Sequence, residues 1–273
     1  MSAKVELYDS AYANYGSEVY RQVRLETYGQ DFGQTSWVSN EESDEIPQLL
    51  KLESGSSVLE LGCGSGGYAM YLAEKIGCKV VGLDVNASGI ENGNQLASAR
   101  RLEACVHFLQ HDASTNLAFD DNSFDALFSN DVLCHVPGRA AVLRQVHRVL
   151  KPGGRLLFSD ALVVGGMVTH EEIAIRSSIG FYAYSPPGEN ERLIEQAGLR
   201  LIKVTDTTEN AAQISARWLQ ARERKKTELI SLEGLRNFEG LQAFLSCVHA
   251  LTNERRLLRK LYLAEKAGGE AVR

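Results

Sequence analysis

The sequence is poor in several features that mark particular classes of protein. Its 273 residues include five cysteines, and no two of them form a Cys-x-x-Cys pair. An odd, scattered set does not build a disulfide framework, so we expect reduced cysteines and a cytoplasmic location. The five are Cys63, Cys78, Cys105, Cys134 and Cys247.

Long apolar runs and long basic runs are also missing. No stretch approaches about 18 consecutive apolar residues, so no membrane insertion is expected. Met1–Ser10 carries three charged side chains and lacks the apolar core of a signal peptide. The formal net charge is −6, and the densest basic stretch, Arg222–Lys226, is interrupted by Glu223. A nucleic-acid partner would show a basic patch, so none is expected.

Two kinds of catalytic site are not indicated either. No set of His, Cys, Asp and Glu residues has the spacing of metal ligands, so no metal is expected. Gly64-Ser65-Gly66 does not have the spacing of the Gly-x-Ser-x-Gly elbow of hydrolases. The composition, 44% hydrophobic and 23% charged, is that of an ordinary globular protein.

Beyond residue 55, short apolar segments alternate with amphipathic ones. Strands that alternate with helices predict crossover connections, and such connections build a mainly parallel sheet with helices on both faces. The expected fold class is therefore α/β and doubly wound. Residues 257–264 fit either one more strand or the tail of a helix. Strands are expected at 58–61, 79–84, 106–110, 124–129, 155–159 and 199–205, and helices at 67–76, 87–101, 139–150 and 189–197.

The first 45 residues differ from the rest of the chain. They hold half of the ten tyrosines, and the apolar residues of 19–28 have helical spacing. We therefore expect residues 1–45 to form an aromatic-rich helical cap or lid, and residues 46–273 to form the main domain. That domain is expected to open with a short helix from Ile46 to about Leu52. Helical insertions are expected near 161–187 and 207–256.

One glycine-rich segment points to a nucleotide site. Glu60–Gly67 reads Glu-Leu-Gly-Cys-Gly-Ser-Gly-Gly and lies directly between an expected strand and an expected helix. Glycines let the backbone turn sharply and let a ligand approach it closely. Open parallel sheets bind ligands beyond the carboxyl ends of their strands. The next strand ends at Asp84, 22 residues after Gly62, where an acid can bind the hydroxyls of a ribose.

Two ligands compete for this segment. A nicotinamide dinucleotide places its pyrophosphate at a helix N-terminus. S-adenosylmethionine has no phosphate and carries positively charged sulfonium and ammonium groups. Glu60, two residues before the first glycine, favours the positively charged ligand. His111-Asp112-Ala113 follows the third strand and can bind the edge of an adenine.

At this point the sequence resembles the class I S-adenosylmethionine-dependent methyltransferases. The resemblance covers about residues 55–160 and comprises five motifs in the order of that family. It implies a Rossmann-like sheet of seven strands, S-adenosylmethionine as cofactor and a small-molecule substrate. The motifs are Glu60–Gly67, Gly82-Leu83-Asp84, His111-Asp112, Ser129-Asn130-Asp131 and Leu150-Lys151-Pro152-Gly153-Gly154.

The resemblance also implies which residues hold the cofactor. The glycine loop would hold the methionine end, the acid after the second strand the ribose, and the residues after the third strand the adenine. Asn130 would border the methyl group. The implied set is Glu60, Gly62, Gly64, Asp84, Val85, Asn86, Asp112, Ala113 and Asn130.

A narrower resemblance concerns residues 129–135. Their Ser-x-Asp-x-x-x-His pattern is similar to that of the phosphoethanolamine N-methyltransferases, in which the histidine pairs with an N-terminal tyrosine to enclose the substrate and assist methyl transfer. The matching residues here are His135 and either Tyr12 or Tyr15.

The part of that family's pattern that binds phosphate is not matched. Ala161 follows Asp160 where the family has an aromatic residue, and Phe181-Tyr182 lacks the neighbouring arginine. A phosphorylated substrate is therefore not implied.

Several side chains allow both a structural and a functional interpretation. Asp131 would cap a helix or bind the substrate. The N-terminal aromatic residues would pack the cap or line an amine pocket. His135 would accept a proton or orient the nucleophile, because an imidazole titrates near neutral pH. Substrate contacts are expected from Asp131, Gln34, Trp37 and Tyr182.

The function predicted from the sequence is methyl transfer to a nitrogen or oxygen of a small molecule. Methylation at carbon, a nicotinamide-dependent oxidoreductase and a non-catalytic nucleotide-binding module are the alternatives. The protein is expected to act as a monomer or homodimer.

Overall fold

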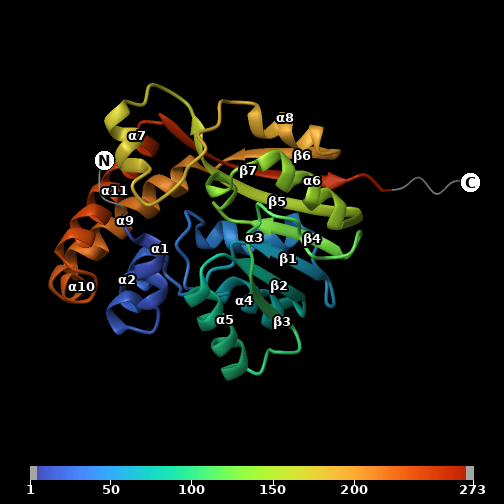
Figure 1. Ribbon diagram of the computed structural model, residues 1–273, viewed down its shortest axis with the longest axis horizontal. Coiled ribbons are helices and arrows are strands. Elements are labelled where there is room, and N and C mark those ends of the chain that lie inside the picture. Colours follow the sequence, from blue (N-terminus) through green and yellow to red (C-terminus); the bar gives the residue numbers. More distant parts are fainter. Residues whose placement is uncertain (1–4, 269–273) are drawn as a thin grey trace, which may run out of the picture.

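The computed structural model describes residues 5–268 and contains one seven-stranded sheet with helices on both faces (Figure 1). The strand order is β3-β2-β1-β4-β5-β7-β6. The first five strands are parallel, and β7 runs antiparallel between β5 and β6. The predicted fold class is thus confirmed. The strands are β1 Ser57–Leu61, β2 Lys79–Asp84, β3 Val106–Gln110, β4 Phe124–Ser129, β5 Leu150–Val164, β6 Leu199–Asp206 and β7 Leu257–Lys266.

The helices lie on the two faces of the sheet and in a cap at the carboxyl ends of its parallel strands. Helices α3 to α5 cover one face, and α6 and α8 cover the other. The remaining helices belong to the cap. The helices are α1 Leu7–Ala13, α2 Glu18–Tyr28, α3 Asn40–Leu49, α4 Gly67–Ile76, α5 Ala87–Ala99, α6 Arg139–Val149, α7 His170–Arg176, α8 Glu189–Gln196, α9 Thr208–Arg224, α10 Lys226–Glu233 and α11 Leu235–Asn253, with a 3-10 turn, η1, over Leu133–His135.

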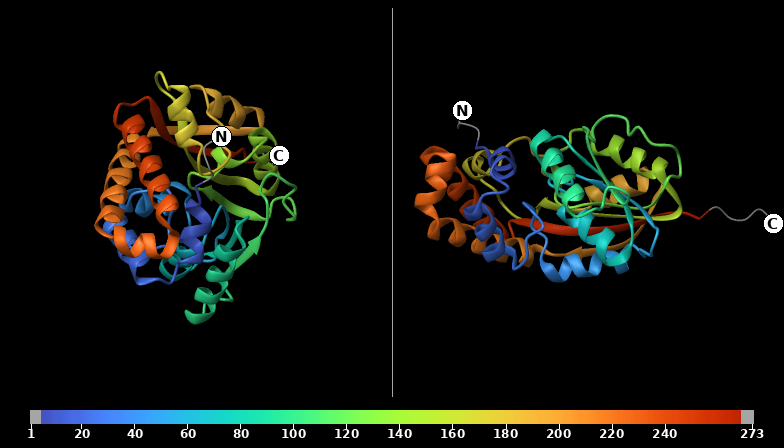
Figure 2. Two further views of the ribbon diagram at one scale, coloured as in Figure 1. Left: turned by 60° about the vertical axis from the view of Figure 1, so that its left-hand side comes forward. Right: turned by 90° about the horizontal axis from the view of Figure 1, so that it is seen from below.

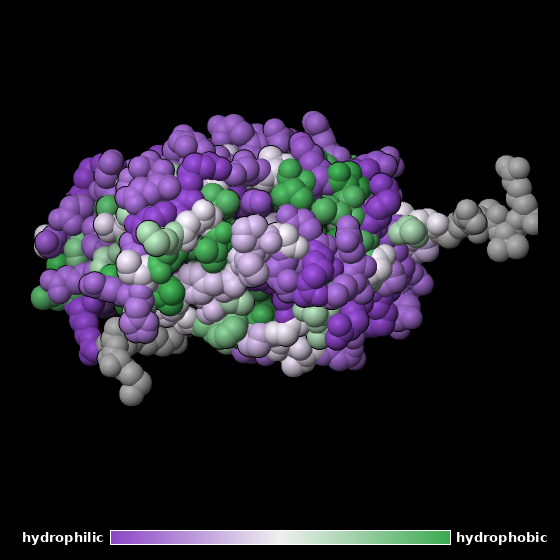
Figure 3. Space-filling view, turned by 90° about the horizontal axis from the view of Figure 1, so that it is seen from above, coloured by the Kyte–Doolittle hydropathy of each residue, from purple (hydrophilic) through white to green (hydrophobic). Residues whose placement is uncertain are grey.

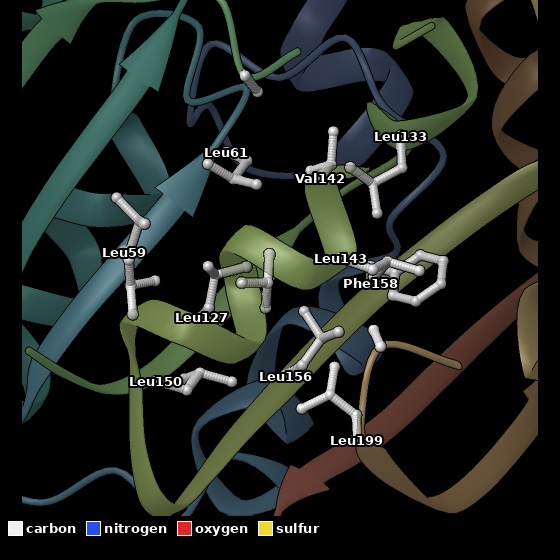
Figure 4. Close-up of a cluster of buried hydrophobic side chains, with 14 of the residues drawn as sticks. Leu59, Leu61, Leu127, Leu133, Val142, Leu143, Leu150, Leu156, Phe158 and Leu199 are labelled. Atoms are coloured by element: carbon white, nitrogen blue, oxygen red, sulfur yellow. The ribbon is translucent and has the colours of Figure 1, made fainter. Parts of the chain in front are cut away.

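Alternation along the central strands builds a hydrophobic core on each face. Leu59 of β1 and Leu127 of β4 point toward α6, whereas Val58 and Ala126 point toward α3 and α4. Figure 4 shows the first of these cores, with side chains from β1, β4, β5 and α6 directed toward one another. Because both faces are covered, these strands are apolar at successive positions, as parallel strands commonly are.

The N-terminal and C-terminal helices form a third core, separate from the sheet. Figures 1 and 2 show α1 and α2 beside α9 to α11 at one end of the molecule. Trp37 lies at the centre of this cap core, with ring centroids 5.9 Å from Trp218 and 6.5 Å from Phe244. The cap is therefore assembled from segments about 200 residues apart in the sequence.

Two elements differ from the sequence predictions. Helix α3 begins at Asn40 rather than Ile46, because Ser39 caps it by accepting a hydrogen bond from Glu42 N. Pro47 then lies inside the helix, where it cannot donate to the carbonyl of Ser43. The Tyr68 hydroxyl donates to that carbonyl instead, at 2.6 Å, so the proline leaves no buried acceptor unpaired.

The second difference is the length of β5. It was expected to span 155–159, but it extends to Val164 because antiparallel pairing with β7 continues to Leu257. Residues 151–154, which precede the expected strand, also lie inside β5, next to an irregularity in the register with β4. The antiparallel partner, which decides the length, lies about 100 residues further along the chain.

A buried ion-pair network joins the sheet to the cap. The guanidinium of Arg259, on β7, donates to Asp131 at 2.9 Å and to Glu42 at 2.7 Å. Asp131 also accepts from the backbone N–H of Trp37 and from the Ser159 hydroxyl. All three charged side chains are buried. The network therefore holds together β7, β5, α3, the loop after β4 and the loop that carries Trp37.

One face of the molecule is mainly polar. Figure 3 shows a face on which hydrophilic residues predominate and hydrophobic residues gather in small groups. Within residues 5–268, none of the helices combines the length and the apolar character that crossing a membrane requires.

We expect Arg259→Met to lower the free energy of unfolding by about 3–5 kcal/mol, because it leaves two buried carboxylates without their counter-ion. Urea unfolding followed by circular dichroism measures the change. Arg192→Met is the matched control: Arg192 pairs with Glu189 on an exposed helical turn, and its loss should cost less than about 0.5 kcal/mol. Equal stability of the two variants would show that the buried network does not support the fold.

Candidate active site

A cavity of about 500 Å³ lies between the carboxyl ends of β1, β2 and β4 and the cap. Every site residue predicted from the sequence lines it, except Tyr15. The sheet contributes one wall, and α1, the loop before α3, and the segment after α7 contribute the other. One half of the cavity therefore lies at the glycine loop, and the second half lies against the cap.

The glycine loop has a conformation that other residues could not adopt. Gly62 and Gly64 have positive φ angles of 77° and 54°. A Cβ on Gly62 would lie 2.2 Å from the Val132 side chain, and one on Gly64 would lie 2.6 Å from the Tyr12 hydroxyl. The Gly62 N–H donates to the carbonyl of Leu83 at 2.7 Å, which fixes the loop against β2. The absence of side chains here lets Val132 and Tyr12 pack directly against the loop.

Asp84 lies at the end of β2 and is held by the backbone. Its two carboxylate oxygens accept from the N–H groups of Gly64 at 2.8 Å and Asn86 at 2.9 Å. Burial raises the pKa of Asp84, and these hydrogen bonds oppose that rise. A carboxylate can accept about four hydrogen bonds, so both oxygens can also accept from the hydroxyls of a ligand.

The neighbours of Asp84 serve different purposes. Val85 is 63% exposed and offers an apolar surface to the cavity. The Asn86 side chain accepts from the Gly89 N–H, capping α5, and donates to Asp9 of α1 at 2.8 Å. Asn86 therefore also links the N-terminal helix to the sheet.

The residues after β3 complete the wall beside Val85. Asp112 accepts from the backbone N–H of Ser114 at 2.8 Å, and hydrogen bonding to Ser114 lowers the pKa of this carboxyl. Ala113 is buried next to it. An ionised carboxylate beside an apolar surface suits the amino edge and the face of an adenine.

Two buried acceptor oxygens beside the cavity have no hydrogen-bond partner among residues 5–268. They are Oε2 of Glu60 and Oδ1 of Asn130, and both residues line the cavity. Burial and the nearby Asp84 raise the pKa of Glu60 to about 8. Buried acceptors are normally paired, so these two indicate a ligand that brings donors, such as an ammonium group.

The second half of the cavity contains a hydrogen-bonded tyrosine and histidine. The Tyr8 hydroxyl lies 2.8 Å from Nε2 of His135, and Nδ1 of His135 lies 3.1 Å from the carbonyl oxygen of Phe181. Because a carbonyl can only accept, Nδ1 carries the proton and Nε2 accepts from Tyr8. Tyr182 packs on the imidazole, with ring centroids 4.2 Å apart.

His135 is neutral in this setting. Burial and then the nearby Arg176 lower its pKa to about 4. The expectation that this imidazole titrates near neutral pH is therefore wrong, because the sequence shows neither its burial nor its charged neighbour.

The tyrosine at His135 is neither of the two expected from the sequence. Tyr12 lies over Gly64, with its hydroxyl 3.5 Å from Thr35 Oγ1. Tyr15 lies outside the cavity, and its ring packs on the guanidinium of Arg24 at 4.6 Å. Tyr8 and Tyr12 are four residues apart on α1, so both point from one face of the helix into the cavity. That spacing is the sequence signal that would have identified Tyr8.

Three predicted substrate residues have other partners. Asp131 lines the cavity, but its carboxylate oxygens already accept from Arg259, Ser159 and the backbone of Trp37. The Gln34 amide bonds to the backbone of its own loop at both ends. Trp37 lines the cavity as part of the cap core.

Arg176 is a further cavity residue that the sequence did not predict. Arg176, the last residue of α7, is 2% exposed. Its guanidinium lies 4.4 Å from the ring centroid of Tyr182 and 5.0 Å from that of Phe244. The sequence shows no arginine next to Tyr182, because the loop after α7 brings in one from six residues upstream. No sequence signal marked it.

No metal site accompanies these residues. Within residues 5–268 no group of three or more His, Cys, Asp or Glu side chains is placed to hold a metal ion.

Comparison with known proteins places the chain among methyltransferases. The family described as "Methyltransferase domain" matches residues 59–158. Methyltransferase GfsG of Streptomyces halstedii is 34% identical over 173 residues, 61% of each chain. The 27-O-demethylrifamycin SV methyltransferase of Amycolatopsis mediterranei is 31% identical over 198 residues, 71% of this chain and 68% of that one.

A solved structure shows the same fold. It is phosphoethanolamine N-methyltransferase 2 of Haemonchus contortus in complex with phosphomonomethylethanolamine and S-adenosylhomocysteine, with a TM-score of 0.79 and 20% identity. The match covers 96% of this chain and 61% of that chain. The chain spans less than two thirds of the length of GfsG and of the plant phosphoethanolamine N-methyltransferases that it also matches.

Proposed function

The chain belongs to the S-adenosylmethionine-dependent methyltransferases, and on this basis we propose that it transfers a methyl group from S-adenosylmethionine to a nitrogen or oxygen atom of a small molecule. One observation carries the proposal. A single cavity joins the unpaired acceptors of Glu60 and Asn130 to the Tyr8–His135 pair.

The half of the cavity at the glycine loop has residues that can bind each part of S-adenosylmethionine. Glu60 and Asn130 would hold the amino-acid end, since their free oxygens can accept from an ammonium group. Asp84 would bind the ribose hydroxyls. The adenine would lie against Val85, Asp112 and Ala113. When bound, the cofactor supplies an already activated methyl group, so the protein contributes position and exclusion of water.

The Tyr8–His135 pair would orient the nucleophile. The Tyr8 hydroxyl donates a hydrogen bond to Nε2 of His135. The Tyr8 oxygen can then accept a hydrogen bond from the N–H or O–H of a substrate. That hydrogen bond would point a substrate lone pair away from Tyr8 and toward the methyl group. As the new bond forms, the nucleophile becomes acidic, and its proton would pass to Tyr8 while the Tyr8 proton passes to Nε2. His135, with a pKa of about 4, is too weak a base to remove the proton beforehand.

This arrangement favours nitrogen or oxygen over carbon as the acceptor. A hydrogen-bond acceptor at the reacting end of the cavity suits a nucleophile that carries a hydrogen on nitrogen or oxygen. Methylation at carbon is the second candidate, and it would leave the Tyr8 hydroxyl without a substrate partner.

The first prediction from this proposal concerns Glu60. In the free protein its pKa is about 8, so below pH 8 it mostly holds a proton. A bound ammonium group favours the carboxylate, so binding releases that proton and strengthens as pH rises. Between about pH 6 and 7.5 the association constant of S-adenosylhomocysteine should rise by up to about tenfold per pH unit. Calorimetric titration measures this slope.

Glu60→Gln is the control for that titration, because an amide keeps the shape without the ionisation. It should bind more weakly and without the pH slope. A parent protein whose affinity does not change over this range would place Glu60 away from the ammonium group. A parent protein that does not bind S-adenosylhomocysteine at all would contradict the proposed function.

A second prediction concerns the catalytic pair. Tyr8→Phe and His135→Ala should each slow turnover by about 100- to 10,000-fold with little change in S-adenosylhomocysteine affinity. The double variant should be no slower than the worse single one, because the two residues act as a unit. Release of S-adenosylhomocysteine, with the first acceptor found by screening amines, phenols and hydroxy compounds, measures the rates.

The pH profile adds a further check. With His135 neutral above about pH 4, the turnover of the parent should show no ionisation near the usual histidine value of about 6.5. Tyr15→Phe, which removes a hydroxyl outside the cavity, should turn over at the parent rate. If Tyr15→Phe were the slow variant and Tyr8→Phe the fast one, the pair would be assigned wrongly.

Of the segment 1–45, the described part that precedes α3 is proposed as the lid of the site. Two side-chain hydrogen bonds hold α1 against α5: Asn86 to Asp9 at 2.8 Å, and Asn92 to the carbonyl of Tyr12 at 2.9 Å. Because α1 also places Tyr8 and Tyr12 over the cavity, the cofactor would leave only when this helix moves.

The lid proposal predicts that removing residues 1–16 speeds the dissociation of S-adenosylhomocysteine by at least about tenfold, the effect of about 1.4 kcal/mol. Turnover should be lost because Tyr8 is removed. Surface plasmon resonance compares the dissociation rates, with full-length Tyr8→Phe as the control that loses the hydroxyl but keeps the helix. An unchanged dissociation rate would mean that α1 does not close the site.

We also propose a cytoplasmic location and a monomeric or homodimeric state. The described cysteines are free thiols, which favours a reducing compartment such as the cytoplasm. Cell fractionation and light scattering test the location and the monomer-or-homodimer state.

A further inference from the structure

Arg176 differs from the other buried arginines of the protein. Among residues 5–268 it forms no salt bridge, and its Nη1 has no hydrogen-bond partner. A buried charge without a counter-ion is costly, so such groups are normally paired. The other arginines at most 7% exposed each have a carboxylate partner: Arg24 with Asp31, Arg139 with Asp160, Arg222 with Glu233 and Arg259 with Asp131 and Glu42.

The surroundings of Arg176 are aromatic rather than acidic. Tyr182 and Phe244 lie against its guanidinium, and all three residues line the cavity beside Tyr8 and His135. Tyr182 also forms a side-chain hydrogen bond with the guanidinium, but it carries no negative charge, and Nη1 still has no partner. Aromatic faces stabilise a cation only in part.

The buried acids of this region, Asp131 and Asp160, are already engaged. Asp131 is neutralised by Arg259, and Asp160 by Arg139. Arg176 is also the one Lys or Arg side chain among the described residues that line the cavity. The substrate half of the cavity therefore holds a single uncompensated positive charge.

We propose that Arg176 binds a carboxylate of the methyl-accepting substrate, whose N–H or O–H nucleophile lies at Tyr8. This inference rests on the proposed function and narrows it to amino or hydroxy acids. The planar guanidinium matches a carboxylate through two parallel hydrogen bonds. One cation balances one negative charge, so a doubly charged phosphate ester would keep an excess charge in the cavity. A substrate whose only charge is an ammonium group would be repelled.

The test uses four small aromatic probes on the full-length protein saturated with S-adenosylhomocysteine. Benzoate carries the carboxylate, benzamide has the same shape without charge, benzylamine is a cation, and phenyl phosphate carries up to two negative charges. Calorimetric titration should show saturable binding of benzoate, at least about tenfold tighter than that of any other probe, as expected for a charge-assisted pair of hydrogen bonds.

Arg176→Met tests the residue itself, since methionine has a similar length and no charge. Benzoate affinity should fall by about 10- to 100-fold, with S-adenosylhomocysteine affinity unchanged, and Arg176→Lys should recover part of the loss. Arg192→Met, at the exposed Glu189 pair, is the matched control and should bind benzoate like the parent.

Each outcome decides the inference. It is overturned if benzamide, benzylamine or phenyl phosphate binds as tightly as benzoate, or if Arg176→Met binds benzoate like the parent. If Arg176→Met does not fold, the four probes on the parent still decide. If the parent binds no S-adenosylhomocysteine, the proposed function fails, and the probes are then compared on the protein alone.

Discussion

The ion pair between Arg259 and Asp131 is the interaction on which the rest of the site depends. Asp131 has a positive φ of 59°, an unusual conformation for a residue other than glycine, and its carboxylate is held by Arg259, Ser159 and the backbone of Trp37. The loop after β4 is thereby fixed on one side to β5 and β7 and on the other to the cap. Asn130 and His135 flank Asp131 in the same loop. The position of both reacting regions therefore follows from one buried charge pair, whose loss would leave unpaired charges in the core.

The two halves of the cavity have opposite electrostatic character. The glycine-loop half contains Glu60 and Asp84, which lie close enough for the charge of Asp84 to raise the pKa of Glu60. The cap half contains Arg176 and a histidine kept neutral. A positively charged cofactor would lie beside the carboxyl groups of the first half, and a negatively charged substrate would lie beside Arg176 in the second. Exchanging the two ligands would place like charges together. In a site with little water such complementarity sets orientation more strongly than shape alone.

The sequence was informative wherever structure follows from local pattern. The bounds of β2, β3, β4 and α4 could be predicted to the residue, because apolar alternation and glycine signals lie within each segment. The glycine loop and Asp84 could be placed for the same reason. Predictions failed where a residue distant in the sequence decides the length of an element. Strand β5 continues because β7 pairs with it, and α3 can include Pro47 because the Tyr68 hydroxyl donates to the carbonyl of Ser43. Arg176 was missed because a loop, rather than a sequence neighbour, brings it to Tyr182.

The position of β7 in the sheet also has a consequence for how the protein is made. This strand lies between β5 and β6, although both are synthesised before it. Until residue 266 has left the ribosome, β5 and β6 each expose an unpaired edge, and such edges pair readily with other chains. Arg259 arrives on the same strand, so the charge that compensates Asp131 and Glu42 arrives late as well. Closing the sheet and neutralising its core are thus one late event in biosynthesis. A ribosome stalled before this strand would hold a chain in which the edges of β5 and β6 can still pair with other chains. In the same chain, Asp131 and Glu42 would lack the counter-ion that Arg259 provides.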